Sequence, residues 1–520
     1  MKKTFNIAGP CYPDEHYMLP AQARCTGLNQ LIEQKQYFVI HAARQSGKTT
    51  LLLELAQQLK EAGDYYVLYC SLETVQGITE PEKGIPAIIQ AMKTQVKFHK
   101  TLKKYPFANQ IDNVAFNVAL RETLTYFCNE LDKPLVVLFD EVDCLSNGTL
   151  ISFLRQLRDG YINRRQIPFA HSIALVGMRN IRDYKSKIRG DGETLRSASP
   201  FNIVADSLTL RNFTLEELVH LYAQHTEQTG QIIPFNVIEK IYHETQGQPW
   251  LVNAIAKEIV VKILKNDFSE IINGVQVEQA AQTIILRRDT HIDSLMERLK
   301  ETRVQKIIEP LILGKTQRYD LLDDDYQYVL DLGLVHEIDK NIAPSNPIYG
   351  EIIIRTLNFR SQQEFEDIDS LPKTAAYLKD GKLDMKRLLS DFQQFWRENS
   401  EIWTERYQYK EAAPLMILQA FLQKMVNSGG RISREMAGGR RRLDLCLHFK
   451  GHRYPIELKL RYSDKTYQEG KKQIAGYMDT LNCSEGWLII FDRRKKTTWR
   501  KKIFWKTDKT TEKTIHLVGC

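Results

Sequence analysis

The sequence lacks the features of a secreted or membrane-spanning protein. Its eight cysteines form no Cys-x-x-Cys pair, so their spacing indicates neither a zinc site nor a disulfide framework. No apolar run approaches the roughly 20 residues that a membrane-spanning helix needs. The two lysines near the start are not followed by the apolar segment of a signal peptide. We therefore expect a protein without membrane contact, in a reducing cytoplasm.

A net positive charge is lacking in most of the chain, where acidic residues slightly outnumber basic ones, and appears at its C-terminal end. The net charge is +8, yet residues 431–520 alone carry 22 Lys/Arg and 10 Asp/Glu. Within them, residues 493–506 combine eight basic residues with Trp499, Phe504 and Trp505. Such a mixture can neutralise phosphates and stack on bases, which predicts nucleic acid as a partner, with DNA as the expected form. The alternative is an edge strand protected by lysines.

A phosphate-binding loop is indicated between residues 37 and 59. An apolar strand leads into the loop "AARQSGKTT", and a helical pattern of leucines follows. The usual pattern is G-x-x-x-x-G-K-[ST]; here Ala42 replaces its first glycine. We expect the lysine of this loop to reach the β- and γ-phosphates of ATP and the first threonine to hold Mg²⁺. The predicted nucleotide-binding residues are Ser46, Gly47, Lys48, Thr49 and Thr50.

A second element, "KPLVVLFDEVD", reads as a buried strand that ends in acids. Ligands of a parallel sheet gather at the carboxyl ends of its strands. Asp140 is expected to bind Mg²⁺, and Glu141 to orient or deprotonate the attacking water. Arg179, at the end of the next strand, is placed to sense the γ-phosphate, and Arg164 and Arg165 could act on a neighbouring subunit. A surface cation is the alternative for each arginine.

Strands and helices alternate around these motifs, which predicts an α/β protein with a doubly wound P-loop NTPase core. A capping box at Thr214 and Glu217 opens a helical lid. Two helices and a hairpin then suggest a winged-helix-like middle domain, in which three consecutive aspartates favour a spacer over a DNA-binding role. The predicted boundaries are 1–213 for the core, 214–290 for the lid, 291–357 for the middle domain, 358–404 for a helical connector and 405–520 for a C-terminal domain.

Eight separated stretches of the first 265 residues resemble, in order, the bacterial AAA-like ATPase family, which is close to the archaeal and signal-transducing P-loop ATPases. They are "FNIAGP", "HYMLP", "AARQSGKTT", "LFDEVD", "LVGMRN", "SPFNI", "NFTLEE" and "GQPWLV". The resemblance implies that residues 5–20 lie near the adenine and that the turn ending in Pro249 contacts the nucleotide. It also implies a switch or a homo-oligomer formed through the ATPase domain.

Near the end, "RRLDLCLHFKGHRYPIELKLRY" predicts a β-hairpin with Gly451 and His452 as its loop. This register places Asp444 opposite Lys459, with Glu457 as a diagonal neighbour. Converging carboxylates are what a Mg²⁺ site needs, and a lysine beside them can stabilise the charge of a reacting phosphate. A cross-strand salt bridge between Asp444 and Lys459 is the structural alternative.

The same residues resemble the PD-(D/E)XK nuclease superfamily over about residues 405–495, although Leu443 stands where the superfamily has proline. The resemblance implies a C-terminal α/β restriction-endonuclease-like domain with Asp444 and Glu457 as metal ligands. Its further site residues are implied to be Lys459, an upstream acid and a residue of the following helix. On this sequence the last two match Glu435 and Gln473.

Together these features predict an ATP-binding and ATP-hydrolysing protein that controls a metal-dependent nuclease domain. Its cofactors are ATP and Mg²⁺, and the resemblances imply a setting such as antiviral defence or control of mobile elements. The alternative is an ATP-dependent switch whose C-terminal domain binds DNA or a partner without cutting. A helicase motor is disfavoured, because the sequence shows neither a second motor domain nor further helicase motifs.

Overall fold

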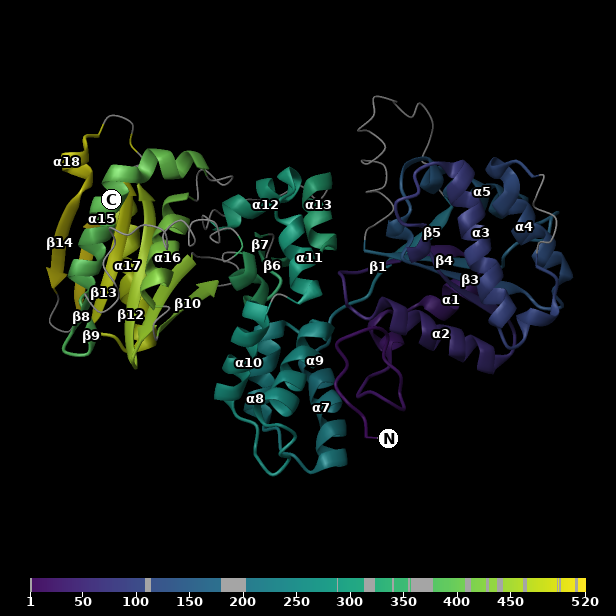
Figure 1. The fold of residues 1–520 in the computed structure, drawn as a ribbon, viewed down its shortest axis with the longest axis horizontal. Helices are drawn as coiled ribbons and strands as arrows, with labels where there is room; N and C mark the ends of the chain where they lie inside the picture. Colours follow the sequence, from purple (N-terminus) through teal and green to yellow (C-terminus); the bar gives the residue numbers. More distant parts are fainter. Residues whose placement is uncertain are drawn as a thin grey trace. The chain divides into compact units, whose positions relative to one another are not determined.

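The computed structural model forms two compact units, which are described separately (Figure 1). The first holds Met1–His291 and Leu322–Leu334, and the second holds Ile292–Leu321 and Val335–Cys520. The residues that the structure describes are 2–107, 114–178, 203–287, 289–312, 323–338, 341–353, 356, 377–406, 413–426, 430–436, 443–461, 465–492, 494, 497–509 and 513–520.

The first unit is built on a parallel sheet of five strands in the order β2-β3-β4-β1-β5. The strands are β1 (Tyr37–His41), β2 (Tyr66–Ser71), β3 (Leu135–Asp140), β4 (Ser172–Gly177) and β5 (Val204–Thr209). β1, β3 and β4 are buried throughout, as expected for strands covered on both faces. The predicted α/β fold of this unit is confirmed, and its last strand begins three residues earlier than predicted.

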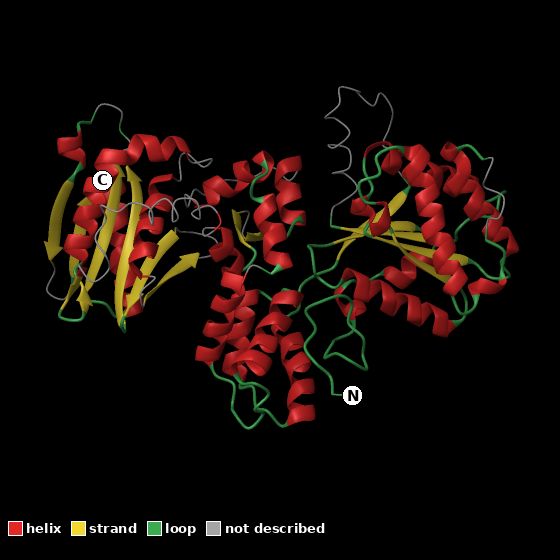
Figure 2. Cartoon of the chain, in the orientation of Figure 1, coloured by secondary structure: helices red, strands yellow, loops and turns green. Residues whose placement is uncertain are grey.

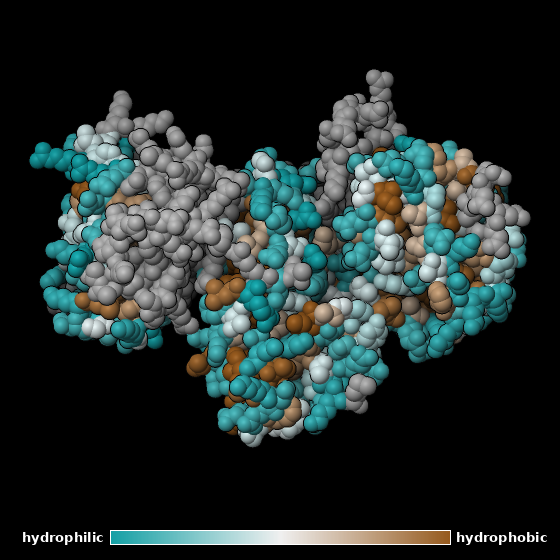
Figure 3. Space-filling model, in the orientation of Figure 1, coloured by the Kyte–Doolittle hydropathy of each residue, from teal (hydrophilic) through white to brown (hydrophobic). Residues whose placement is uncertain are grey.

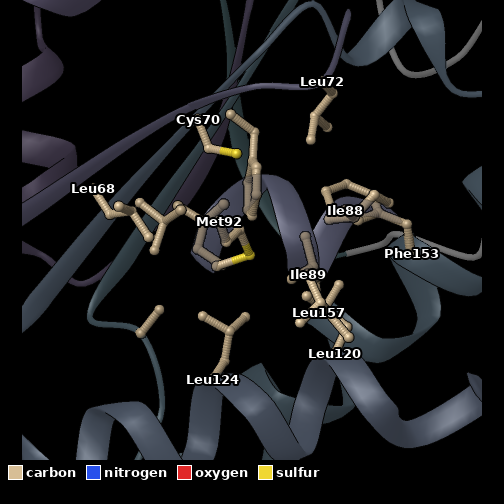
Figure 4. Packing of buried hydrophobic residues seen from close by; sticks show 14 of the residues in the cluster. Leu68, Cys70, Leu72, Ile88, Ile89, Met92, Leu120, Leu124, Phe153 and Leu157 are labelled. Carbon is tan, nitrogen blue, oxygen red and sulfur yellow. The ribbon is translucent and has the colours of Figure 1, made fainter. Parts of the chain in front are cut away.

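Helices cover both faces of this sheet. One face packs against η1 (Ala21–Arg24), α1 (Leu28–Glu33) and α2 (Lys48–Ala62). The other packs against α3 (Pro81–Phe98), α4 (Phe116–Glu130) and α5 (Asn147–Asn163). Figure 4 shows side chains of β2 and of the three helices α3, α4 and α5 pointing into one core. Successive side chains of β3 point to opposite faces of the sheet. Val136 therefore packs with the core beneath η1, α1 and α2, and Val137 packs with the core beneath α3, α4 and α5.

A helical lid follows the sheet. It contains α7 (Leu215–Thr229), α8 (Phe235–Thr245), α9 (Pro249–Lys257), a π-helical segment (Glu258–Ile263) and α10 (Gly274–Arg287). The predicted capping box is present: the Thr214 hydroxyl accepts from the Glu217 amide at 3.2 Å, and the Glu217 carboxylate accepts from the Thr214 amide at 2.8 Å. Apolar side chains such as Phe235 and Val275 are exposed on the lid. Figure 3 shows hydrophobic residues in brown among the hydrophilic surface of the protein.

Three helices and a hairpin follow the lid along the chain. They are α11 (Thr290–Arg298), α12 (Thr302–Ile312), α13 (Asp324–Asp331), β6 (Val335–Ile338) and β7 (Asn341–Pro344). The sequence analysis expected two helices before the hairpin, whereas the structure has three, and α13 belongs to the first compact unit while the hairpin belongs to the second. The Asp323 carboxylate caps α13 by accepting from the amides of Asp325 and Tyr326 at 2.8 and 3.2 Å. The acidic run therefore serves a helix start, where negative charge is favourable.

The C-terminal part contains a mixed sheet of six strands in the order β10-β11-β12-β13-β15-β14 (Figure 2). The neighbours β12, β13 and β15 are parallel, and the outer pairs are antiparallel. The strands are β10 (Gly430–Met436), β11 (Leu443–Phe449), β12 (His452–Arg461), β13 (Glu485–Asp492), β14 (Phe504–Lys509) and β15 (Thr514–Gly519).

Helices lie on both faces of the C-terminal sheet. Leu488 of β13 packs with Ile474 of α17 (Lys465–Leu481), whereas Phe491 packs on Trp396 of α15 (Met385–Arg406). The Gln393 amide of α15 also donates to the Gly519 carbonyl at 2.6 Å. The second half of the predicted connector, residues 358–404, thus contributes to α15, which packs on the C-terminal sheet. The remaining elements are α16 (Ala413–Val426), α18 (Trp499–Lys502) and the short strands β8 (Leu378–Lys379) and β9 (Lys382–Leu383).

All eight cysteines are free thiols, in line with their spacing. Throughout the described part of the chain, we find no helix with the length and apolar character required to traverse a bilayer.

Candidate functional site

The phosphate-binding loop runs from the end of β1 to the start of α2. Gly47, the residue before the helix, has φ +96°, a left-handed conformation that glycine adopts without steric cost. Lys48 is buried, and its amine donates to the carbonyls of Ala42 and Ala43, both at 3.0 Å. Burial lowers the pKa of Lys48, while the carboxylates of the loop's neighbours oppose this shift. The loop's own carbonyls therefore hold the amine that we expect at the phosphates.

The carboxyl end of β3 brings the predicted magnesium residues together. The Thr49 hydroxyl donates to Asp140 at 2.7 Å, although 91 residues separate them. The Tyr69 hydroxyl of β2 donates to the same carboxylate oxygen at 3.1 Å. A hydroxyl beside a carboxylate is the oxygen donor set that Mg²⁺ binds beside phosphates, so these residues fit the ion.

Glu141 follows β3 with φ +55°, an uncommon conformation for a residue with a side chain. Such conformations cluster at functional sites. Burial raises the pKa of Glu141, and the Lys48 ammonium opposes this shift. A carboxylate with a raised pKa is a better proton acceptor near neutral pH. The position of Glu141 directly after β3 and its raised pKa are both consistent with the predicted role of accepting a proton from the attacking water.

Asp143 is a site residue that the sequence analysis did not identify. Its carboxylate accepts a hydrogen bond from the Met178 amide, at the end of β4. Asp143 also contributes to the electrostatic field at Lys48. It thereby ties the segment after β3 to the strand that precedes Arg179, which itself lies outside the described residues. The third acid of the run "LFDEVD" was the available signal.

The lid and the N-terminal segment both reach the loop. The Gln248 side chain donates to the Gln45 carbonyl at 3.4 Å, and its oxygen caps α9, which begins at Pro249. The Thr50 hydroxyl accepts from the Cys11 amide at 3.0 Å, so the segment expected near the adenine does contact the loop. Thr50 thus has a structural partner in addition to its predicted role.

Arg164 makes contacts that favour the structural alternative over an arginine finger. Its guanidinium donates to the Lys35 carbonyl at 2.6 Å and lies 3.8 Å from the centre of the Tyr161 ring. It also lies over Tyr37, the first residue of β1. These residues are at the amino end of the strand, whereas the phosphate-binding loop follows its carboxyl end. Arg165 is exposed.

The C-terminal hairpin exists, but its predicted register is wrong by two residues. Leu445 pairs with Ile456, and Phe449 pairs with His452, so the loop consists of Lys450 and Gly451. Both loop residues have positive φ, +47° and +81°, as a type I′ turn requires. The predicted loop would have placed a histidine at the position that glycine occupies. Because the shift is even, every side chain keeps its face of the sheet.

The correct register changes the neighbours of Asp444. The observed pairs end at Leu445 and Ile456, and the same register continued by one residue would bring position 444 opposite Glu457 instead of Lys459. On the other side, Asp444 pairs with Glu435 of β10. Three acidic positions would then lie in one row across three strands. The side chains of Glu435 and Asp444 lie outside the described part of the structure.

Glu457 and Lys459 form a buried ion pair on β12, with side chains 1% and 5% exposed. The Asp444–Lys459 salt bridge, the structural alternative of the sequence analysis, lies outside the described residues, because it depends on the Asp444 side chain. Both residues are aligned with β13 residues that pack on α17, the helix carrying Gln473. The buried Gln473 Oε1 has no hydrogen-bond partner among the residues described. The side chains with described positions contain no group of three His, Cys, Asp or Glu arranged to hold a metal.

The basic segment ends in β14, at the edge of the C-terminal sheet. Lys506 and Lys509 are exposed along this strand. The Trp505 ring lies 5.9 Å from the His516 ring, and the Lys502 amine lies 5.2 Å from the Trp499 ring. These contacts match the edge strand protected by lysines. They leave nucleic-acid binding by this segment as a prediction.

The fold and the loop define the class of the first unit. A parallel sheet in the order β2-β3-β4-β1-β5, with a phosphate-binding loop after β1 and an acidic β3, is that of a P-loop ATPase. The profile of the AAA-like domain family matches residues 15–353. The chain belongs to this family.

The C-terminal region matches a different profile. Residues 385–495 match a domain of unknown function (DUF8371), which gives no support to the nuclease resemblance. No match was found among curated proteins.

Several solved structures are similar to the chain. The Walker-type ATPase of Pyrococcus abyssi is 13% identical over 67% of this chain and 99% of its own, with a TM-score of 0.48. RuvB of Thermotoga maritima, described as a Holliday junction branch migration motor, is 15% identical over 62% and 90%, with a TM-score of 0.32. Cdc6p of Pyrobaculum aerophilum is 13% identical over 64% and 91%, with a TM-score of 0.35.

Proposed function

We propose that the first unit binds and hydrolyses ATP with Mg²⁺. The hydrogen bond between Thr49 and Asp140, beside the buried amine of Lys48, is the observation that carries this proposal. Thr49 and Asp140 would hold the ion, which neutralises charge on the phosphates. Lys48 would exchange its two carbonyl partners for phosphate oxygens, and Glu141 would orient the attacking water or take its proton.

Nucleotide binding and phosphate release by the purified chain test this proposal. Lys48→Ala is expected to weaken ATP binding by about tenfold or more, since a buried charge-assisted contact is lost. Lys60→Ala is the matched control, because Lys60 is an exposed lysine of the same helix. Equal ATP affinity in wild type and Lys48→Ala would show that this loop does not bind the phosphates of ATP.

We further propose that the C-terminal sheet carries a metal-dependent nuclease, controlled by the ATPase and acting on DNA. The pairing of positions 435 and 444 across β10 and β11, with Glu457 on the neighbouring strand β12, supports this reading, because carboxylates on adjacent strands can share one ion. Lys459, buried beside Glu457, supplies the positive charge that a reacting phosphate needs. Gln473 would contact the nucleic acid or the site from α17.

Cleavage assays with single- and double-stranded DNA and RNA, with Mg²⁺ and with or without ATP, test the nuclease. Asp444→Asn is expected to abolish cutting without changing the fold. Asp508→Asn is the control, because Asp508 is an exposed residue of β14 in the same sheet and pairs with Lys471 of α17. If Lys48→Ala also changes cutting, the two activities are coupled.

The second candidate function is an ATP-dependent switch whose C-terminal domain binds without cutting. The buried Glu457–Lys459 pair favours it, because a salt bridge within a strand can be purely structural. Binding of DNA with no cleavage in any of these reactions would establish this candidate in place of the nuclease. Sedimentation with and without ATP would test the proposed homo-oligomer.

A further inference from the structure

Arg24, the last residue of η1, lies beneath the phosphate-binding loop and is 6% exposed. One of its terminal nitrogens donates to the Ser46 carbonyl at 3.1 Å and to the Arg211 carbonyl at 2.9 Å. Its guanidinium carbon also lies 4.6 Å from the centre of the Phe213 ring. These three contacts join the loop to the connection between the sheet and the lid.

The bond to Ser46 fixes the peptide unit between Ser46 and Gly47. In a trans peptide the C=O and N–H groups point in opposite directions. Because the Ser46 carbonyl points at Arg24, the Gly47 N–H points away from it. The amides of such a loop are the groups that cradle phosphates. A Cβ on Gly47 would lie 2.9 Å from Arg24, so the two residues are also packed together.

The charge of Arg24 has no carboxylate partner among the described residues. Its most influential acid, Glu217, is already bound by Arg211, with N–O distances of 2.7 and 2.8 Å. Burial lowers the pKa of Arg24 to about 10, which keeps the group protonated at neutral pH. A buried cation without a counter-ion is costly, and an anion bound in the adjacent loop would compensate it.

Arg24 is also linked to the lid through its contact with the Phe213 ring. The Phe213 amide donates to the Gly247 carbonyl at 2.9 Å, in the turn that precedes α9. A Cβ on Gly247 would lie 2.0 Å from the Phe213 carbonyl oxygen, so this contact is close. A movement of the Ser46–Gly47 peptide can thus be transmitted to the lid turn at Gly247 through Arg24 and Phe213.

We propose that Arg24 is a positioning residue for the phosphates of a nucleoside di- or triphosphate. It holds the Gly47 N–H toward the phosphates and adds a buried cation behind the loop, on the carbonyl side of the Ser46–Gly47 peptide. This inference rests on the proposed ATP binding. It goes further by assigning phosphate recognition to a side chain outside the loop motif.

Binding of ATP, ADP and adenosine by calorimetry tests this role in the full chain. Arg24→Ala is expected to weaken ATP and ADP by about tenfold or more and to leave adenosine unchanged. Arg24→Lys keeps the charge but not the planar fork that serves two carbonyls, so its loss should be intermediate. In steady-state hydrolysis, KM should rise more than kcat falls.

Lys60→Ala is the control, because it removes one exposed positive charge from the helix that follows the loop and leaves every contact of Arg24 in place. Its effect on ATP affinity should stay within about twofold, because an exposed charge interacts weakly through solvent. Wild-type protein that fails to bind ATP overturns the proposed function itself. Wild-type binding with equal affinity in Arg24→Ala overturns only the inference, as does an equal loss for adenosine and ATP. If Arg24→Ala does not fold, the ATP and adenosine affinities of Arg24→Lys are compared with those of wild type, and equal ATP affinity overturns the inference.

Discussion

Two glycines of the lid have similar positive φ angles but different surroundings. Gly230 ends α7 with φ +77°, and Gly247 follows α8 with φ +69°. A Cβ on Gly230 would meet no atom within 4 Å, whereas a Cβ on Gly247 would lie 2.0 Å from the Phe213 carbonyl oxygen. Alanine at Gly230 should therefore cost only conformational strain, about 1–2 kcal/mol.

Alanine at Gly247 should cost that strain and a steric term. The obstructing atom belongs to the backbone, so no rotamer change can relieve the contact. Overpacking of this kind adds about 1–3 kcal/mol, which gives about 2–5 kcal/mol in total. The displaced turn also carries Gln248, so the Gly247 variant should lose ATP affinity while the Gly230 variant keeps it.

Denaturant unfolding of the full chain, followed by ATP titration of each folded variant, measures both effects. The two substitutions add the same methyl group in the same conformation, so their difference isolates the contact with Phe213. Equal losses of unfolding free energy in the two variants would refute the packing of the lid turn against Phe213. Unchanged ATP affinity in Gly247→Ala would refute the link from this turn to the loop.

Three further predictions concern charged and polar groups of the two sites. Glu141→Gln should keep ATP binding and lower hydrolysis by about 100-fold or more, measured as phosphate release; in wild type, the rate should rise with pH through the raised pKa of Glu141, because the deprotonated form is active. Glu457→Gln or Lys459→Met alone should cost about 3–5 kcal/mol of unfolding free energy by leaving one buried charge, whereas the double variant should recover most of it; additive losses would contradict this pairing. Tyr69→Phe removes one donor to Asp140 and should lower stability by about 1 kcal/mol in thermal unfolding, and an unchanged midpoint would show that the bond contributes nothing.

Local sequence patterns were sufficient to predict the ATPase core. The loop ending in Lys48 and the strand ending in Asp140 each carry their chemistry within a few residues. Parallel strands then bring their carboxyl ends to one edge of the sheet. The Thr49–Asp140 contact follows from these patterns without any knowledge of the packing.

The C-terminal hairpin shows that local patterns do not determine the register between two strands. Alternating apolar residues specify the face of each side chain, but a shift of two residues preserves every face. The register depended on the loop, where Gly451 supplies the second positive φ and Lys450 the first. The sequence suggested a two-residue loop at Gly451 but did not decide which neighbour shares it. The partner of Asp444 changed with that choice.

Arg24 could not be predicted because its role depends on contacts that are remote in sequence. Its two carbonyl acceptors are 22 and 187 residues away. Nothing in "AQARC" distinguishes this arginine from a surface cation. Only the fold shows that it is buried beneath the loop.

The loop's hydrogen bonds suggest how the proposed switch can respond to nucleotide. The carbonyls of Ala42 and Ala43 bind the Lys48 amine, the Gln45 carbonyl accepts from the lid, and the Ser46 carbonyl accepts from Arg24. Phosphates that attract Lys48 would free the first two carbonyls and reorient the peptides that follow. Those peptides carry the contacts to the lid and to η1. Because binding and conformation are linked reciprocally, a lid held in another position must change phosphate affinity by the same factor. The switch therefore needs the exchange of a few hydrogen bonds at one loop, and no rearrangement of the sheet.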